Sequence, residues 1–319
     1  MAVVVAAHPP VRQVQKRCRF PARHPDPCGE REHLEQAAKS TSKSAVSRRF
    51  VERTEPALAE LLATDLSGVA LVALMVDGVH FAGHLCVVAL GVDAEGVKHP
   101  LAVVEGSTEN TTVVRELLVG LRERGLDTTR PILAVLDGAK ALAAGGREVF
   151  DRPVIARCQL HKIRNVTDKL PEKMRSTVES RMRQAYTAGS ELEAKAQLEA
   201  LIRELDKTRP GAAASLREGL DETLTVLRLG VPPTLARTLR STNAIESMIG
   251  ICRNHARNVK RWRDGQMALR WCAAGMAEAR GQFRRVNGHL HLAKLAAELE
   301  RVTAETVGVT PDNETVQAA

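Results

Sequence analysis

The sequence predicts an α/β protein in which a mixed β-sheet is interrupted by a large all-helical insertion. Short apolar runs, typical of strands buried on both faces, recur between positions 71 and 157. Segments in which apolar residues return with helical spacing separate the later runs. From position 168 to about 229, Glu, Lys, Arg, Leu and Ala dominate, and this composition favours helices alone.

Length and charge limit the class of protein. A chain of 319 residues can bury a sizeable core, sufficient for one large domain and smaller pieces. Its formal net charge of +8 favours a polyanionic partner. The six cysteines form no Cys-x-x-Cys pair, which fits a reducing compartment better than a disulfide framework. No apolar run reaches the roughly 18 residues of a transmembrane helix, so we expect a cytoplasmic protein with no membrane partner.

Two kinds of segment precede the first strand. Residues 1–38 contain five prolines and no clear period, and we expect them to be poorly structured. Residues 39–64 are expected to form two helices. The first has an apolar face with Ala45, Val46 and Phe50, and its polar face carries Lys43, Ser47, Arg48 and Arg49. The second is predicted over Glu55–Ala63.

Residues 65–167 are predicted to form the first part of the α/β core. The first strand, Leu71–Val76, ends in Asp77-Gly78. A second strand over His80–Val92 and a third over Val97–Glu105 follow after short turns. Three strands joined in this way predict an antiparallel meander.

The later strands of the core alternate with helices. A helix over Asn110–Arg124 is followed by a fourth strand over Pro131–Leu136. Because a crossover helix joins them, the first and fourth strands are expected to pair in parallel. A short helix over Ala139–Phe150 and a fifth strand over Pro153–Arg157 complete this part.

The remaining chain is expected to be helical. Residues 168–238 form the insertion, with breaks at Gly189-Ser190 and Arg209-Pro210-Gly211. Residues 239–302 form the second part of the core and include helices over Gln266–Arg280 and Leu290–Val302. Residues 303–319 are expected to be a disordered tail.

Two acids follow buried strands, each in an Asp-Gly pair. Asp77 follows the first strand and Asp137 the fourth, so both carboxylates can meet at one edge of the sheet. Like charges that close repel each other unless a cation lies between them. An Asp-Gly turn between two strands is the alternative for Asp77.

A third acid, Glu246, lies on a helix that Ser241 or Thr242 can cap. Three carboxylates provide only oxygen ligands, which suit Mg²⁺ or Mn²⁺ and not zinc. We expect Asp77, Asp137 and Glu246 to be the metal ligands, with Asn243 orienting the site. The alternative for Glu246 is a capping box with Asn243, three residues before it.

Cys158-x-x-His161 stands where the fifth strand gives way to a helix. This pair is only half of a zinc site, because no second Cys/His pair at suitable spacing follows it. We expect Cys158 to contribute mainly to packing. An ordinary histidine at the start of a helix is one interpretation of His161.

A basic cluster follows the helix of Glu246. It is typical of a surface that tracks phosphates and stacks bases, although a solvated basic loop has the same composition. We expect it to bind DNA through Arg253, Arg257, Lys260, Arg261, Trp262 and Arg263.

Four segments together resemble a known family, the mutator-type transposases of bacterial insertion sequences. They are Leu-Met-Val-Asp-Gly-Val-His-Phe around Asp77, Ala-Val-Leu-Asp-Gly-Ala-Lys-Ala-Leu around Asp137, Cys-Gln-Leu-His-Lys-Ile-Arg-Asn from Cys158, and Arg-Ser-Thr-Asn-Ala-Ile-Glu up to Glu246. The resemblance extends from about Ser40 to about Arg301. It implies an RNase H-like core, which the predicted order of strands and helices also matches, with a catalytic Asp-Asp-Glu triad.

The resemblance also implies a reaction. A transposase of this type would cut DNA at the ends of an element and join the freed 3′-hydroxyl to target DNA. In our hypothesis two Mg²⁺ ions support both steps, with Asp77 shared between them, while Asp137 and Glu246 hold one each. His161 would be a catalytic residue that contacts DNA or a metal-bound phosphate. Arg164, in the same motif, and Asn243, beside Glu246, would contact DNA.

For residues 39–64 the resemblance implies a remnant helix-turn-helix, whose recognition helix would carry Lys43, Ser47, Arg48 and Arg49 to the major groove. An ordinary amphipathic surface helix is the alternative. The partners implied are double-stranded DNA, as terminal repeats and target, and other copies of the chain. Because the family begins with a longer helical region, we expect a truncated chain. It could then be an inactive protein that only binds DNA, or a nuclease of the same fold.

Overall fold

The computed structural model describes residues 43–106 and 110–307, and side chains over 48–106 and 110–305. The chain divides after Arg48 into two units, and the elements below belong to the second unit apart from the first residues of α2. The expectation of poor structure for residues 1–38 lies outside the described residues. None of the helices described has the length and apolarity needed to cross a membrane.

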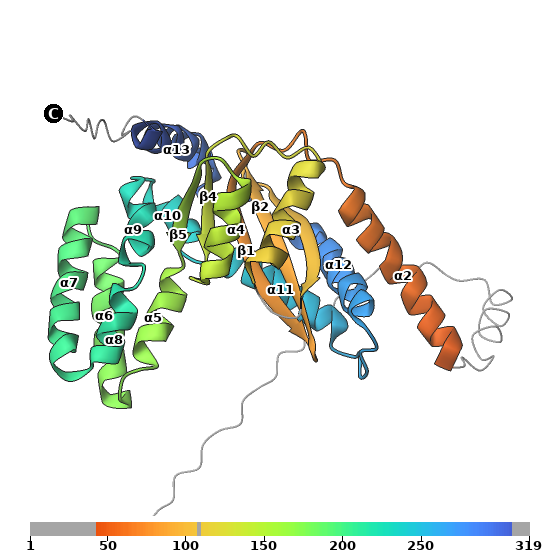
Figure 1. Cartoon of the computed structure of the whole chain (residues 1–319), viewed down its shortest axis with the longest axis horizontal. Helices are drawn as coiled ribbons and strands as arrows, with labels where there is room; N and C mark the ends of the chain where they lie inside the picture. The colour runs from red at the N-terminus through yellow and green to blue at the C-terminus, as the bar shows by residue number, and fades with distance from the viewer. Residues whose placement is uncertain (1–42, 107–109, 308–319) are drawn as a thin grey trace, which may run out of the picture. The chain divides into compact units, whose positions relative to one another are not determined.

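A five-stranded mixed sheet with the order β3-β2-β1-β4-β5 forms the centre (Figure 1). The first three strands, β1 (Leu71–Phe81), β2 (His84–Asp93) and β3 (Lys98–Gly106), pair antiparallel, which confirms the predicted meander. β4 (Ile132–Leu136) pairs with β1 in parallel, and β5 (Pro153–Arg157) pairs with β4 in parallel. The predicted parallel pairing of the first and fourth strands is therefore confirmed.

The predicted end of the first strand is wrong, because β1 continues through Asp77 to Phe81. Asp77 pairs with Val88 of β2, so the Asp-Gly pair lies inside a strand and does not form a turn. Val79 and Phe81 are buried and keep the strand alternation beyond the acid, which holds this segment in the sheet. The turn comes later, at Ala82, where φ is 53°.

Helices cover both faces of the sheet. One face packs against α3 (Thr111–Glu123) and α4 (Lys140–Val149), which lie in front of the sheet in Figure 1. The other face packs against α11 (Asn243–Ala256), α12 (Gly265–Gln282) and α13 (Leu292–Val307). From Ala73 onward, after a register shift in β1, odd-numbered side chains such as Met75 and Val79 lie on the second face, while even-numbered ones such as Leu74 and Val76 lie on the first.

The insertion is all-helical, as predicted, and has a hydrophobic core of its own. Fully buried side chains such as Met182, Leu198 and Leu216 form that core. The helices that enclose it are α5 (Gln159–Thr167), α6 (Glu172–Ala185), α7 (Glu191–Thr208), α8 (Pro210–Arg217) and α9 (Leu220–Arg228). A break at Gly219, with φ of 63°, and the short helix α10 (Pro233–Leu239) were not predicted.

Two predictions at the ends of the described chain are wrong. A single helix, α2 (Lys43–Ala63), replaces the two helices expected there, and it runs through Pro56. Packing outweighs the missing proline N–H, because Leu58 and Leu61 lie against the core and the Phe50 ring lies 5.2 Å from Trp271. At the other end α13 extends to Val307, so residues 303–307 are helical, and residues 308–319 lie outside the described chain.

Candidate active site

Strand register brings the two aspartates near each other. Met75 of β1 pairs with Val135 of β4; Asp77 lies two residues further along β1, and Asp137 directly follows the last residue of β4, Leu136. Because side chains alternate along a strand, Asp77 lies on the same face of the sheet as Met75. Paired strands run about 4.8 Å apart, and the charge of Asp137 acts on Asp77, so the two acids lie close together at the carboxyl end of β4.

The carboxyl of Asp77 has a strongly perturbed pKa. Burial is the main cause that raises it from 3.8 to about 6, and the negative charges of Asp137 and Glu246 contribute to the same rise. The hydrogen bond that Oδ1 accepts from the N–H of Gly78 at 2.7 Å and the charge of His161 oppose it. Asp77 therefore interacts electrostatically with the two other predicted acids and with the predicted histidine.

Asp137 stands at the start of α4, where its Oδ1 accepts a hydrogen bond of 2.9 Å from the N–H of Ala139. The glycine after it is required, because Gly138 has φ of 109°. A β-carbon at Gly138 would also lie 2.2 Å from Nε of Arg157. This Asp-Gly pair therefore ends a strand, as predicted, and makes room for an arginine.

Glu246 lies in the first turn of α11, on the same face of the sheet as the two aspartates. Its Oε1 accepts a hydrogen bond of 2.6 Å from the hydroxyl of Thr242. The alternative of a capping box with Asn243 is wrong, because Asn243 is the first residue of the helix and Thr242 is the N-cap. The N–H of Thr242 lies 3.4 Å from Sγ of Cys158. Thr242 is the N-cap residue, as predicted, but its side chain caps no backbone N–H.

The hydroxyl of Thr242 is the member of this centre that sequence reasoning missed. Besides Glu246, Oγ1 lies 3.3 Å from Nδ1 of His161 and 3.4 Å from Sγ of Cys158. Its single proton can serve one acceptor at a time, and the shortest contact is to Glu246. The only signal in the sequence was a threonine at a helix start, which is a common capping residue.

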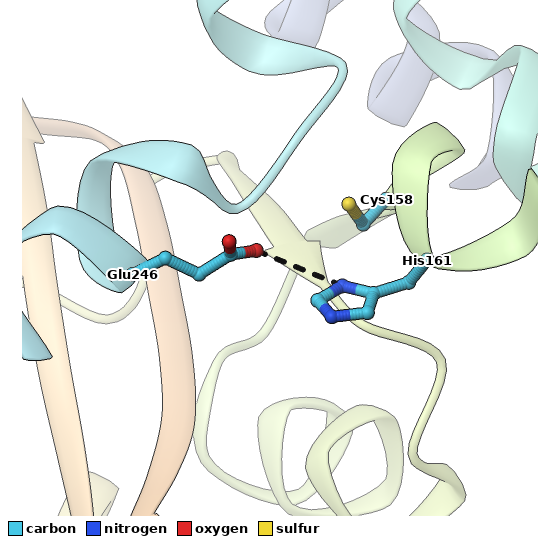
Figure 2. Close-up of side chains that lie close together, drawn as sticks. All are labelled: Cys158, His161 and Glu246. Carbon is cyan, nitrogen blue, oxygen red and sulfur yellow. Dashed lines mark ion pairs between the residues drawn. The ribbon is translucent and has the colours of Figure 1, made fainter. Parts of the chain in front are cut away.

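Cys158 and His161 stand at the start of α5 and face Glu246 across the gap to α11 (Figure 2). Burial alone would raise the pKa of the Cys158 thiol, but hydrogen bonds to His161 and Thr242 outweigh it and leave the pKa lowered. The hydrogen bond to Cys158 raises the pKa of His161, and burial opposes it. Cys158 is fully buried, which fits the predicted packing role, and its sulfur also takes part in this polar network.

Most of the predicted DNA-binding side chains are exposed. Arg48 and Arg49 are exposed on α2, whereas the side chains of Lys43 and Ser47 lie outside the described part of the chain. The other exposed members are Arg164, Asn243, Arg253, Arg257, Lys260, Arg261 and Arg263. Their exposure leaves the prediction of DNA contact open.

Trp262 differs from the rest of the basic cluster because it is half-buried. Its ring centroid lies 5.0 Å from that of Phe81, at the end of β1. The basic segment is therefore anchored beside the strand that carries Asp77. Part of the ring is occupied by this contact.

The described cavities lie elsewhere. One of about 360 Å³ opens beside Gly138 and is lined by charged residues of α4, β5 and the α8–α9 turn, including Lys140, Arg147, Arg157, Glu218 and Glu222. None of the three predicted acids lines it. The acid centre is instead a partly exposed surface between the sheet edge, α5 and α11, which leaves it accessible to a large substrate.

These features define a class: an α/β protein whose candidate centre combines acids from two neighbouring strands with an acid from a packed helix. Residues 31–286 match the Mutator family of transposases. The chain belongs to this family.

Relatives that are named as transposases support the assignment. The transposase for insertion sequence element IST2 of Acidithiobacillus ferrooxidans is 31% identical over 173 residues, which cover 54% of this chain and 57% of that protein. The transposase for IS6120 of Mycolicibacterium smegmatis is 32% identical over 197 residues, 60% of each chain. The chain thus spans 57% to 60% of the length of these two relatives.

Proposed function

We propose that this chain catalyses divalent-metal-dependent cleavage and strand transfer of insertion-sequence DNA. The observation that carries the proposal is the convergence of Asp77, Asp137 and Glu246. The β1–β4 register aligns the two aspartates, and the charges of Asp137 and Glu246 both raise the pKa of Asp77. Relatives named as transposases for insertion sequences support the substrate class.

The residues fit the metal that this chemistry needs. Three carboxylates offer hard oxygen donors, and their mutual repulsion is the condition that a divalent cation relieves. Asp77, Asp137 and Glu246 would hold Mg²⁺ or Mn²⁺, as two ions. When bound, such ions supply a nucleophile of lowered pKa and stabilise the leaving oxygen.

Other side chains would position the DNA. His161 is partly exposed beside Glu246 and would contact a phosphate at the centre. The exposed arginines and lysine of the basic cluster would neutralise phosphates further along the duplex. The order β3-β2-β1-β4-β5, with acids on the two central strands, favours the RNase H-like fold that we infer. Assembly of several copies on the DNA is part of the same proposal.

Asp77→Asn is the direct test. Purified protein is incubated with DNA that carries candidate element ends, with and without Mg²⁺, and nicked and joined products are scored. We expect the variant to lose about 10³-fold or more of the cleavage rate, because a metal-binding carboxylate is replaced, while it keeps its affinity for DNA. Glu116→Gln, an exposed acid of α3 on the other face of the sheet, is the matched control and should cleave normally.

Each outcome separates the candidate functions. Cleavage that survives in Asp77→Asn would end the assignment of the acids. Nicks without joined products would indicate a nuclease. Wild-type protein that binds element ends but never cuts them, with Mg²⁺ or Mn²⁺, would indicate a protein that only binds DNA.

A further inference from the structure

Three chemically different donors meet beside the acid centre. A nitrogen of His161, the sulfur of Cys158 and a carboxylate oxygen of Glu246 all lie within 4.8 Å of one another. Figure 2 shows the three side chains facing one another, two from the start of α5 and one from α11. The sequence predicts only half a site from Cys158 and His161, and the fold supplies a third donor from a distant helix.

The spacing is close to that of a metal site. Around a tetrahedral zinc ion, bonds of 2.0–2.3 Å place the ligand atoms about 3.3–3.6 Å apart. Nδ1 of His161 lies 3.8 Å from Oε1 of Glu246, and no pair exceeds 4.8 Å. Closing the set around an ion thus requires movements of about 1 Å, which small side-chain rotations provide.

Thr242 contacts the three candidate ligand atoms from the buried side, and solvent reaches His161 and Glu246 from the other side. Thr242 is fully buried, and its Oγ1 lies within hydrogen-bonding distance of all three donors. His161 and Glu246 keep side-chain exposures of 26% and 33%, so an ion can enter between them. Three protein ligands then leave a fourth position for solvent, as in zinc sites that are not purely structural.

We propose that Cys158, His161 and Glu246 form a binding site for a thiophilic divalent ion of the zinc class. Mg²⁺ takes oxygen ligands, whereas thiolate and imidazole ligands select zinc and similar transition metals. This site is therefore distinct in chemistry from the three-carboxylate site, although Glu246 belongs to both.

Sharing Glu246 has a consequence that rests on the proposed function. An ion bound through Cys158 and His161 withdraws Glu246 from the catalytic acids, so zinc inhibits the Mg²⁺-dependent reaction. Binding is measured without any activity assay. A protein that binds the ion but never cuts DNA would contradict the proposed function alone, and one that cuts DNA but binds no ion would contradict this site alone.

Cobalt(II) absorbance is the test, because a thiolate bound to Co²⁺ gives a charge-transfer band that Mg²⁺ cannot give. We expect the intact chain to show this band with one Co²⁺, and a single equivalent of Zn²⁺ to abolish it. Cys158→Ser should lose the band, and Glu246→Gln should bind Co²⁺ about tenfold more weakly or worse. Cys252→Ser, which removes a buried thiol from the helix of Glu246, is the control and should keep the band.

Three results would overturn the site: no band in the wild type, an unchanged band in Cys158→Ser, or a band lost in Cys252→Ser alone. Displacement of Co²⁺ by an equal concentration of Mg²⁺ would also overturn it, because the donors would then be oxygens. If Cys158→Ser fails to fold by circular dichroism, the partly exposed Glu246→Gln decides. Binding as tight in that variant as in the wild type excludes the carboxylate as a ligand.

Discussion

Two clusters of charged side chains lie on either side of the junction of β5 and α5. Two consecutive residues of α5, His161 and Lys162, belong to different clusters. His161 faces the acids Asp77, Asp137 and Glu246, whereas Lys162 faces away from them toward Glu218. We call the first the acidic cluster, made of Asp77, Asp137, His161 and Glu246. The second is the Lys162 cluster, made of Arg157, Lys162 and Glu218.

Both cations of the Lys162 cluster have acceptors within the fold, although Nε of Arg157 is buried without one. Lys162 is fully buried, and its Nζ donates hydrogen bonds to the carbonyl oxygens of Ser215 and Glu218. The Glu218 carboxylate lies 3.7 Å from that Nζ and 3.2 Å from the guanidinium of Arg157. Burial and the neighbouring charge of Arg157 together lower the pKa of Lys162 to about 8, although the Glu218 carboxylate opposes them.

The acidic cluster is arranged in the opposite way. Burial, with the charges of Asp137 and Glu246, raises the pKa of Asp77 to about 6, against its hydrogen bond with Gly78 and the charge of His161. Among the described residues, no lysine or arginine forms a salt bridge with Asp77, Asp137 or Glu246. A cluster that satisfies its own charges stabilises the fold, and one that leaves repulsion unrelieved is prepared for a cation from outside.

Replacing Lys162, the central residue of the Lys162 cluster, is expected to have the largest effect. Lys162→Ala leaves a cavity and removes the charge that Glu218 and two buried carbonyl oxygens accept from. We expect the free energy of unfolding to fall by about 3–5 kcal/mol, measured by urea denaturation near neutral pH. Lys207→Ala, an exposed lysine of α7, is the control, with an expected change within about 0.5 kcal/mol.

If Lys162→Ala and Lys207→Ala were equally stable, the contrast between the two clusters would be wrong, because the Lys162 cluster would then contribute nothing to the free energy of unfolding. A Lys162→Met variant separates the effect of the lost charge from that of the cavity. Methionine fills the space without the charge, so the loss should shrink to the cost of the unsatisfied carbonyl groups, about 1–3 kcal/mol.

In the acidic cluster, a substitution that removes the charge should raise the free energy of unfolding, because ionised Asp77 destabilises the fold. Its folded pKa of about 6 lies above the ordinary value of 3.8, so between these values the folded state binds the proton more tightly. The free energy of unfolding therefore falls as pH rises from about 4 to about 6 and stays lower above that. Without metal, Asp77→Asn should be more stable than the wild type by about 1–3 kcal/mol near pH 7, and equal to it near pH 4.

Added Mg²⁺ should remove this difference, because it stabilises only the chain that keeps the carboxylate. Thermal unfolding at several pH values, with and without Mg²⁺, measures both effects. A variant that is no more stable than the wild type near neutral pH would show that the repulsion at Asp77 is already relieved within the fold.

Much of the sheet could be predicted from the sequence, because each strand is a short apolar run bounded by turn residues. Places where packing or pairing overrides a local signal were harder to foresee. Asp77-Gly78 interrupts an apolar run, yet pairing with β2 carries β1 past it. Pro56 is a typical helix breaker, yet packing of Leu58 and Leu61 against the core keeps α2 continuous. Pro233 begins the short helix α10, which was not predicted.

The candidate acids could be selected from the sequence for the same local reason, because Asp77 and Asp137 each follow a short apolar run in an Asp-Gly pair. The donors around Glu246 could not. Thr242 and Cys158 are separated by 84 positions, and only the packing of α11 beside the start of α5 brings them into contact. A threonine at a helix start predicts a cap, and nothing in the local sequence indicates that its hydroxyl lies against a thiol and an imidazole.

Thr242 gives the smallest of the expected effects and the sharpest test of how Glu246 is held. Its hydroxyl donates the 2.6 Å hydrogen bond to the Glu246 carboxylate from a fully buried position. Thr242→Val keeps the shape and removes that bond. We expect the cleavage rate to fall by about 10–100-fold, about 1.4–2.7 kcal/mol of barrier, because the carboxylate is no longer positioned.

Thr242→Ser is the matched control, because it restores the hydroxyl and should cleave within a few-fold of the wild type. A positioning role also predicts that the valine variant needs more Mg²⁺ for its half-maximal rate while its affinity for DNA is unchanged. Loss of stability alone would lower the rate of both variants without moving their Mg²⁺ dependence. If the valine and serine variants cleave equally well, the hydrogen bond to Glu246 has no part in the reaction, and the packing of α11 alone must hold the acid in place.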